Sequence, residues 1–144
     1  MIENFDKAFI AVIGFEGTVS EQVTGDKGGL TKFGISQRSY PNLDIANLTL
    51  DDAKKIYQRD YWQAMHCDAL DWPLDLVVFD SSVNCGVGQA RKWLDITTNW
   101  QMYLFMRMKF YADISGDGAN IKFIRGWLNR TYKLARIAQG WASA

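Results

Sequence analysis

The sequence predicts one mainly α-helical domain with a small β-hairpin corner near residues 17–36. Most of the chain repeats its apolar residues at helical spacing, whereas residues 17–36 collect five glycines among Thr, Val and Ser. The 144 residues are 48% apolar and 14% aromatic, which suits one well-packed core and is too short for two domains of ordinary size. No internal repeat or low-complexity linker divides the chain.

The first half of the chain predicts two helices with the β-hairpin corner between them. Apolar positions over residues 5–15 predict a first helix that runs up to Gly14. The glycine-punctuated stretch that follows predicts an irregular hairpin with little regular strand. From Leu48 a second helix is expected, because Thr49 and Asp52 resemble a capping box. It should run to about Met65, with one apolar face formed by Ala53, Ile56, Tyr57, Tyr61 and Ala64.

The second half predicts a central helix and three further helices. Asp71-Trp72-Pro73 is a helix start signal, since proline suits the first helical turn. The residues after it are strongly apolar, so this helix should be buried, and Gly86 and Gly88 should end it. Further helices are expected at about 89–98, 99–114 and 120–142.

Charge and apolar patterning narrow the functional classes. Sixteen basic and sixteen acidic side chains cancel, which argues against a nucleic-acid partner and removes a general attraction to an anionic cell wall. The acidic, polar residues 1–7 differ from the basic start of a secretory signal. The apolar stretch 100–114 contains Arg107 and Lys109 and is too short to span a bilayer. We therefore expect synthesis in the cytoplasm without a signal peptide, no stable membrane insertion, and a monomer.

Neither a metal nor a cofactor is predicted. Cys67, Cys85 and the single histidine, His66, lack the spacing of a structural zinc site. A disulfide between the two cysteines is not required in a domain of this size, and nothing in the sequence decides whether they pair.

Two acids and a threonine make the most informative chemical pattern. Glu16 follows the apolar run Ile13-Gly14-Phe15, and an apolar wall beside its carboxyl would raise its pKa, as a general acid requires. Asp26 lies among glycines in a wet setting, where a carboxylate should stay ionised and could activate water. The hydroxyl of Thr31 can orient that water. The simpler alternatives are a solvated glutamate at a helix end and an ordinary strand threonine.

Several further residues are candidates for substrate binding. Phe33 and Gly34 offer an aromatic ring and a bare backbone where a sugar could approach closely. Asp80 and Asn84 are four apart and share one helix face, so they could line a cleft opposite Glu16. Alternatively, Asn84 satisfies backbone groups near the β-hairpin corner. Tyr111 and Arg130 could also reach such a cleft.

These residues carry a resemblance to a known family. The stretch that begins Glu16-Gly17 and continues Asp26-Lys27-Gly28-Gly29-Leu30-Thr31-Lys32-Phe33-Gly34-Ile35 resembles the glycoside hydrolase family 108 muramidases, which include phage endolysins and bacterial lysozymes. It is more loosely similar to the Glu…Asp…Thr triad of T4-type lysozymes. The stretch Asp80-Ser81-Ser82-Val83-Asn84-Cys85-Gly86 resembles the family's Asp-x-x-x-Asn-x-Gly motif. Two departures are Thr18, where a second glycine is common, and one extra residue between Glu16 and Asp26 relative to the T4-type spacing.

The resemblance implies an organisation and an activity. It implies a single lysozyme-like domain over residues 1–144, with a catalytic segment at 1–88. Residues 89–144 resemble the helical segment described as a predicted peptidoglycan-binding domain, through Arg107, Phe110-Tyr111, Asn120, Phe123, Gly126-Trp127 and Arg130. The implied reaction is hydrolysis of the β-1,4 bond between N-acetylmuramic acid and N-acetylglucosamine. Glu16 would be the proton donor, and Asp26 and Thr31 would hold the attacking water, with inversion favoured over retention.

Other functions remain open at the level of sequence. The favoured hypothesis is a phage or prophage endolysin that a holin-like membrane partner releases to the wall in the periplasm. The chain could instead be a bacterial muramidase that assists secretion, a protein that binds peptidoglycan without cutting it, or a lytic transglycosylase, which needs one acid and no water-positioning partner. The host and the type of wall are not encoded in any motif.

Overall fold

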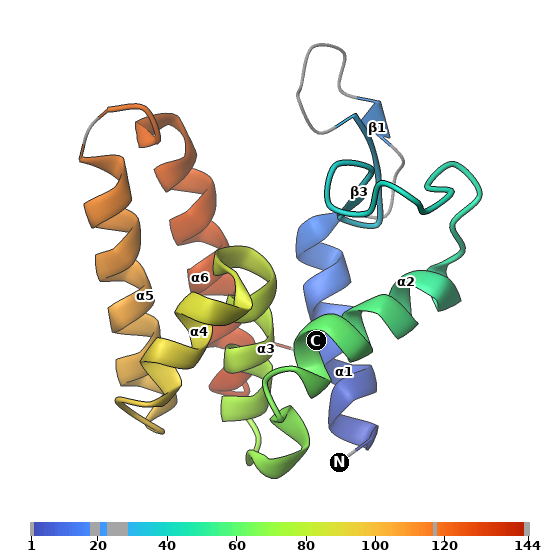
Figure 1. The fold of residues 1–144 in the computed structure, drawn as a ribbon. Coiled ribbons are helices and arrows are strands. Elements are labelled where there is room, and N and C mark those ends of the chain that lie inside the picture. The colour runs from blue at the N-terminus through green and yellow to red at the C-terminus, as the bar shows by residue number, and fades with distance from the viewer. Residues whose placement is uncertain (1, 18–20, 23–28, 117, 143–144) are drawn as a thin grey trace.

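The fold is mainly α-helical, as the sequence predicts, with a small antiparallel sheet at one end (Figure 1). The computed structural model describes residues 2–17, 21–22, 29–116 and 118–142. Within these ranges the helices are α1 (Ile2–Glu16), α2 (Leu50–Tyr57), α3 (Leu74–Cys85), α4 (Val87–Leu94), α5 (Trp100–Ser115) and α6 (Ile124–Ala138). Short helical turns are η1 (Gln58–Gln63), η2 (Cys67–Ala69) and η3 (Ile121–Phe123). No described helix combines the length and apolarity needed to cross a bilayer.

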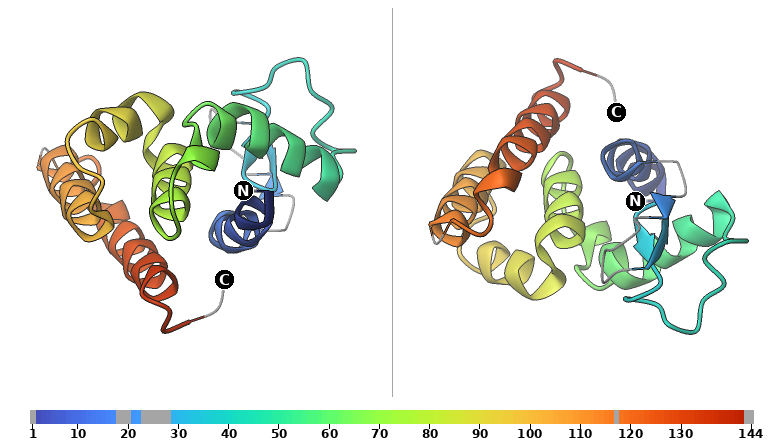
Figure 2. Two further views of the ribbon diagram at one scale, coloured as in Figure 1. Left: turned by 90° about the horizontal axis from the view of Figure 1, so that it is seen from below. Right: turned by 90° about the horizontal axis from the view of Figure 1, so that it is seen from above.

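Helix α3 lies at the centre of the molecule, between α1 on one side and α4, α5 and α6 on the other (Figure 2). All residues from Leu74 to Ser82 are buried. A helix that is apolar on nearly every side must be covered on every side, which explains its central position. The sequence-based prediction of a central buried helix is confirmed.

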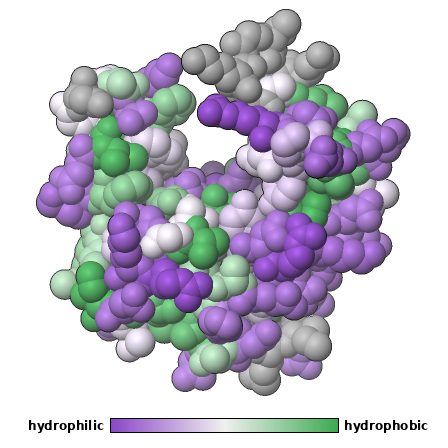
Figure 3. Space-filling view, viewed as in Figure 1, coloured by the Kyte–Doolittle hydropathy of each residue, from purple (hydrophilic) through white to green (hydrophobic). Residues whose placement is uncertain are grey.

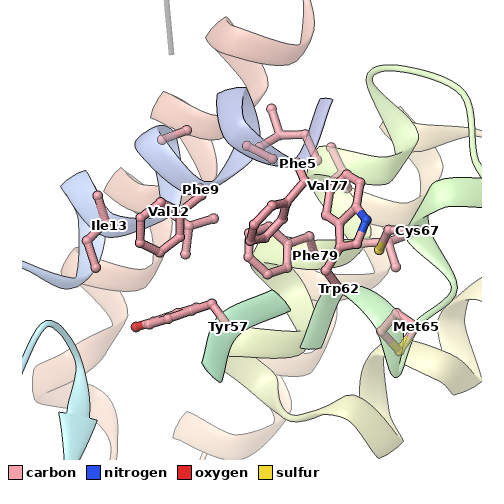
Figure 4. Close-up of a cluster of buried hydrophobic side chains, with 14 of the residues drawn as sticks. Phe5, Phe9, Val12, Ile13, Tyr57, Trp62, Met65, Cys67, Val77 and Phe79 are labelled. Carbon is pink, nitrogen blue, oxygen red and sulfur yellow. The ribbon is translucent and has the colours of Figure 1, made fainter. Parts of the chain in front are cut away.

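An aromatic cluster joins α3 to the N-terminal half of the chain (Figure 4). The ring of Phe79 meets the rings of Phe5, Tyr57 and Trp62 edge to face, with centroids 5.4 to 6.4 Å apart. Such pairs stabilise beyond the area that they bury, by about 0.5–1.5 kcal/mol each. The cluster therefore fixes how α1 and α2 lie against α3.

Helix α2 begins with the predicted capping box. The Thr49 hydroxyl accepts from the backbone N–H of Asp52, and the Asp52 carboxylate accepts from the N–H of Thr49. After Tyr57 the helix continues in π geometry through η1, which the sequence pattern did not predict. A π turn adds one residue to each turn, so the buried face shifts by one position. Trp62 and Met65 are buried in place of the expected Tyr61 and Ala64.

The β-hairpin corner is a three-stranded antiparallel sheet of very short strands, in the order β1-β2-β3. Strands β1 (Glu21–Gln22), β2 (Leu30–Lys32) and β3 (Ile35–Ser36) confirm the prediction of little regular strand. The register places Thr31 opposite Ser36 and Lys32 opposite Ile35. Only the two residues between Lys32 and Ile35 therefore form the β2–β3 turn.

Helix boundaries differ from the expected ones by a few residues. Helix α1 continues past Gly14, so Glu16 is its last residue. Gly86 ends α3, but Gly88 does not, because α4 starts at Val87 and includes it. The expected helix at 120–142 is the short turn η3 followed by α6.

Candidate active site

Glu16 lies where α1 ends and the chain turns toward the sheet. The following residue, Gly17, has a φ of +93°, and its N–H donates to the carbonyl of Ile13 at 3.0 Å. A glycine favours this turn because a side chain at positive φ is strained. The Glu16 side chain is 22% exposed, so its carboxyl is partly sheltered but still accessible. The space-filling view is hollowed between the lobe of α5 and α6 and the lobe of the sheet (Figure 3).

The β2–β3 turn packs directly against Glu16. Phe33 and Gly34 both have positive φ, 51° and 75°, as a tight two-residue hairpin turn requires. This conformation is costly for a bulky residue, and the Tyr57 hydroxyl secures it by donating to the Phe33 carbonyl at 2.9 Å. A Cβ on Gly34 would lie 2.5 Å from that hydroxyl, 2.9 Å from Cβ of Glu16 and 3.1 Å from its Oε2. Only glycine fits there.

Arg130, on α6, holds the other side of the Glu16 carboxyl. One terminal nitrogen of the guanidinium lies 2.5 Å from Oε1 of Glu16, and the other lies 2.8 Å from Oδ1 of Asp80. The same guanidinium lies over the Phe15 ring, 5.3 Å from its centroid. A planar guanidinium can serve two carboxylates and an aromatic ring at once, which a lysine ammonium cannot do with the same geometry.

A buried polar network supports Arg130 from behind. Oδ2 of Asp80 lies 2.7 Å from a terminal nitrogen of Arg107, and the Arg107 Nε donates to the Tyr111 hydroxyl at 2.6 Å. Tyr111 in turn donates to the side-chain carbonyl of Asn84. Asp80 and Arg107 are fully buried and Tyr111 almost so. Within the described residues every buried side-chain nitrogen or oxygen has a hydrogen-bond partner, so the network is closed.

The electrostatics of this network favour charged groups. Burial alone would raise the pKa of Asp80, but the charges and hydrogen bonds of Arg130 and Arg107 outweigh it and leave the pKa below its ordinary value. Burial likewise opposes the charge on Arg130, yet Asp80 and Glu16 raise its pKa overall. Arg130 is therefore a permanent cation between two acids.

The structure brings most of the predicted site residues together. Glu16, Phe33 and Gly34 meet at the end of α1, and Asp80, Asn84 and Tyr111 join them through the two arginines. Thr31 lies in β2, partly buried. Asp26 lies outside the described residues.

The network residues lie deeper than the sequence predicts. Asp80 and Tyr111 offer no surface to a glycan, whereas Asn84 is partly exposed at the edge of the network. Asp80 and Asn84 do share one face of α3, but two arginines and a tyrosine cover that face.

The role of Arg130 was the hardest to read from the sequence. It contacts Glu16 across 114 positions of chain, and no local motif links the two residues. The sequence analysis named Arg130 only as a residue that could reach the cleft, although a buried acid such as Asp80 must find cations somewhere. Arg107 and Arg130 supply them.

The described residues contain no group of three or more His, Cys, Asp or Glu side chains arranged to hold a metal ion. Cys67 and Cys85 are both free thiols. The groups that the structure places beside the Glu16 carboxyl are a guanidinium and the backbone of a tight turn.

Comparisons with known proteins support one family. The structure is similar to the solved structure of SagA from Brucella abortus, with a TM-score of 0.78, 21% sequence identity, and coverage of 97% of this chain and 96% of that one. At this identity the likeness establishes the fold. No curated protein sequence matches significantly. The model of the family described as "Glycosyl hydrolase 108" matches residues 9–86. This is more than half of the chain, and it includes Glu16, Gly34, Asp80 and Asn84. The chain therefore belongs to glycosyl hydrolase family 108, and it is a glycoside hydrolase that acts on peptidoglycan.

Proposed function

We propose that this chain is a muramidase that hydrolyses the β-1,4 bond between N-acetylmuramic acid and N-acetylglucosamine in peptidoglycan. One observation carries the proposal. Glu16 is a partly exposed acid with one oxygen, Oε1, held by Arg130, while Oε2 faces the bare Phe33–Gly34 turn. This arrangement suits a general acid, because a carboxyl that is fixed through one oxygen can deliver its proton from the other oxygen in one direction.

The proposed reaction starts at Oε2 of Glu16. Its proton passes to the glycosidic oxygen as the bond to the anomeric carbon breaks and positive charge develops on the sugar ring. The glycine at position 34 lets the turn pack beside Oε2 of Glu16, so a sugar whose glycosidic oxygen reaches Oε2 would contact the turn, where the Phe33 ring offers an apolar face. Phe33 and Gly34 are thus proposed to bind substrate.

Water completes the reaction on the opposite face of the sugar. We assign the Asp26 carboxylate to activate that water and the Thr31 hydroxyl to orient it, which gives an inverting hydrolysis. Support for Thr31 comes from its place in the middle of β2, the strand that leads into the Phe33–Gly34 turn.

Asp80 and Tyr111 are assigned a supporting role rather than direct contact with the glycan. Asp80 anchors Arg130, and Tyr111 fixes Arg107, which anchors Asp80 in turn. Asn84 closes this chain of contacts and, being partly exposed, is the member that can also reach a substrate amide or hydroxyl.

In its biological setting, we assign the chain to phage or prophage lysis, as a monomer that a holin-like partner releases to the wall. Residues 1–88 would carry the acid and the turn, and residues 89–144 would pack on them as a helical segment that also supplies Arg130. A bacterial muramidase that assists secretion is the alternative, and genes for a holin or a secretion system beside this gene would separate the two.

The experiment that tests the proposal replaces Glu16 with Gln. Glu16→Gln should lower the release of new reducing ends from purified peptidoglycan by at least ~10²-fold, because the proton donor is lost. The side-chain carbonyl of Gln can still accept from Arg130, so the melting temperature should change little. Glu3→Gln, an exposed acid in the same helix, is the matched control and should keep full activity. Full activity of Glu16→Gln would refute the assignment.

The products distinguish the rival reactions. Mass spectrometry of the digested wall should find reducing muramic acid ends. A preponderance of 1,6-anhydro ends would instead indicate a lytic transglycosylase, and retention on the wall without any new ends would indicate a binding protein.

A further inference from the structure

Helices α5 and α6 form an open apolar groove on the outside of the molecule. The groove has a volume of about 370 Å³ and is lined almost entirely by apolar atoms, chiefly from Trp100, Leu104, Phe105, Met108, Leu128 and Tyr132. Two of these side chains are largely uncovered: Phe105 is 61% and Tyr132 is 62% exposed. Exposed aromatic and aliphatic side chains that gather along one groove mark an interaction surface more often than scattered ones do.

The charge of the chain is strongly uneven around this groove. Residues 118–144 contain five basic residues and no acid, so the neutral total leaves residues 1–117 with an excess of five acids. Three of the five basic residues, Arg125, Lys133 and Arg136, are exposed on α6. The Arg136 guanidinium lies 5.9 Å from the centroid of the Tyr132 ring, and Arg125 lies seven positions, about two turns, before Tyr132 on the same face, so these two cations form a basic stripe at the edge of the groove. Lys133 lies only about 60° from Arg130 around the helix, so it is not part of this stripe.

Helix α6 separates this surface from the active site. Successive residues of a helix are about 100° apart, so Arg130 lies about 200° from Leu128 in one direction and from Tyr132 in the other. Arg130 reaches Glu16, whereas Leu128 and Tyr132 line the groove on the opposite side. The groove and the catalytic site are thus two faces of the same helix.

The apolar groove and the basic side chains beside it together favour one kind of binding partner. Aromatic and aliphatic side chains beside Lys and Arg on a surface helix are typical of segments that lie in the interface of an anionic membrane. A second copy of this chain fits poorly, because it would place two basic α6 helices against each other. The sugars of a glycan strand are uncharged, and the carboxylates on its peptides bring no apolar chains to fill the groove.

We propose that the α5–α6 groove and the basic stripe of Arg125 and Arg136 form a docking surface for anionic phospholipid membranes. The apolar side chains enter the interface and the basic ones meet lipid phosphates. Because Arg130 faces the other way, docking leaves the Glu16 site directed away from the bilayer. The proposal does not rest on the muramidase assignment, since lipid binding needs no catalysis.

Vesicle co-sedimentation tests the proposal with the intact chain. We expect binding to vesicles of equal parts phosphatidylglycerol and phosphatidylcholine, weakening as salt rises, and little binding to phosphatidylcholine alone. The double variant Arg125→Gln, Arg136→Gln should bind on the order of 25-fold more weakly, at roughly 5-fold for each charge. The double variant Phe105→Ser, Tyr132→Ser should bind ~10-fold more weakly.

Matched controls keep these outcomes specific. Ile10→Ser removes an equally exposed apolar residue from α1, and Lys92→Gln removes an exposed charge from α4; both should bind as the unchanged protein does. All variants should cleave soluble peptidoglycan fragments at the normal rate, so a loss of lipid binding is distinct from a loss of catalysis.

Three results would overturn the proposal. The first is equal binding to neutral and anionic vesicles, or to neither. The second is sedimentation equilibrium showing a dimer that Phe105→Ser, Tyr132→Ser dissolves, which would assign the groove to a second copy. The third is binding to purified wall sacculi that Arg125→Gln, Arg136→Gln loses, with no binding to vesicles, which would assign the stripe to an anionic wall polymer.

Discussion

At the scale of single residues, Arg130 links the proposed acid to the buried polar network. It holds Oε1 of Glu16 and, together with Arg107, compensates the buried charge of Asp80. The position of the proposed acid is thereby tied to a fully buried charge. A residue that acts through Glu16 in this way is a positioning residue, and its effects should appear in turnover more than in binding.

Replacing Arg130 with Lys tests this positioning role. Lysine keeps the charge but presents one ammonium, which cannot span both carboxylates. We expect kcat on peptidoglycan fragments to fall about 10- to 100-fold with KM nearly unchanged. Arg136→Lys, in an exposed position of the same helix, should leave both constants unchanged. A change confined to KM would mean that Arg130 binds substrate instead.

Replacing Gly34 with Ala tests the fit of the turn against Glu16. The added Cβ would lie 2.5 Å from the Tyr57 hydroxyl and 2.9 Å from Cβ of Glu16, at a φ that strains any side chain. We expect the free energy of unfolding to drop by about 1–3 kcal/mol and activity to fall with it. Gly88→Ala is the comparison, because that helical position has open space and should gain stability. Thermal unfolding of both variants measures the two changes in stability.

At the scale of elements, α3 is a mostly apolar helix that places the polar face of Asp80 and Asn84 in the core. Its sequence predicted both its burial and the shared face of Asp80 and Asn84, because apolar content and helical period are local properties. What the sequence could not supply was the cover of that face. Arg107 and Arg130 arrive from α5 and α6 through tertiary packing, which leaves no local pattern.

The same distinction explains the other successes and failures of prediction. The capping box at Thr49 and the short strands of the hairpin corner follow from neighbouring residues and were predicted. The π turn η1 was not, since it follows from the way Trp62 is buried against distant rings. Glu16, Phe33 and Gly34 were identified as candidates by their local pattern, whereas the contact between them depends on the sheet folding back on α1.

The buried Asp80 carboxylate on α3 should make the free energy of unfolding depend on pH. The pKa of Asp80 is lowered in the folded state, so its contribution is present above about pH 4, the ordinary range of an unfolded aspartate, and is lost as pH falls from there toward the folded value. Asp80→Asn should lower stability near neutral pH by about 3–5 kcal/mol, by leaving two arginines uncompensated, and should flatten the acid limb of the curve.

Chemical denaturation across the acidic range measures this effect. Asp113→Asn, which breaks the exposed ion pair with Lys109, is the control and should cost at most ~1 kcal/mol. If Asp80→Asn kept the steep acid limb of the unchanged protein, other carboxylates would have to be responsible for it.

At the scale of the whole molecule, the family match covers only part of the site. The match ends at residue 86, but the contact that holds Glu16 comes from residue 130. The neutral net charge likewise hides an uneven distribution, because residues 1–117 have an excess of acids and residues 118–144 contain only basic charges. We therefore treat residues 1–144 as one functional unit.

A fragment of residues 1–88 tests that unity. It contains Glu16, Asp26 and Thr31, yet it lacks both arginines that neutralise Asp80 and the α5 and α6 surfaces that cover α3. We expect it to be poorly folded by circular dichroism and inactive on peptidoglycan. Addition of residues 89–144 as a separate chain should restore part of both signals. A folded, fully active fragment would show that α6 is dispensable.

The contact between Glu16 and Arg130 also sets an order of events during synthesis. A ribosome adds about 5–20 residues each second, so Arg130 is made on the order of 10 s after Glu16. During that interval the nascent chain carries the proposed acid without the Arg130 contact that orients it. The proposed active site is thus complete only after α6 has left the ribosome and has brought Arg130 to Glu16 at the end of α1.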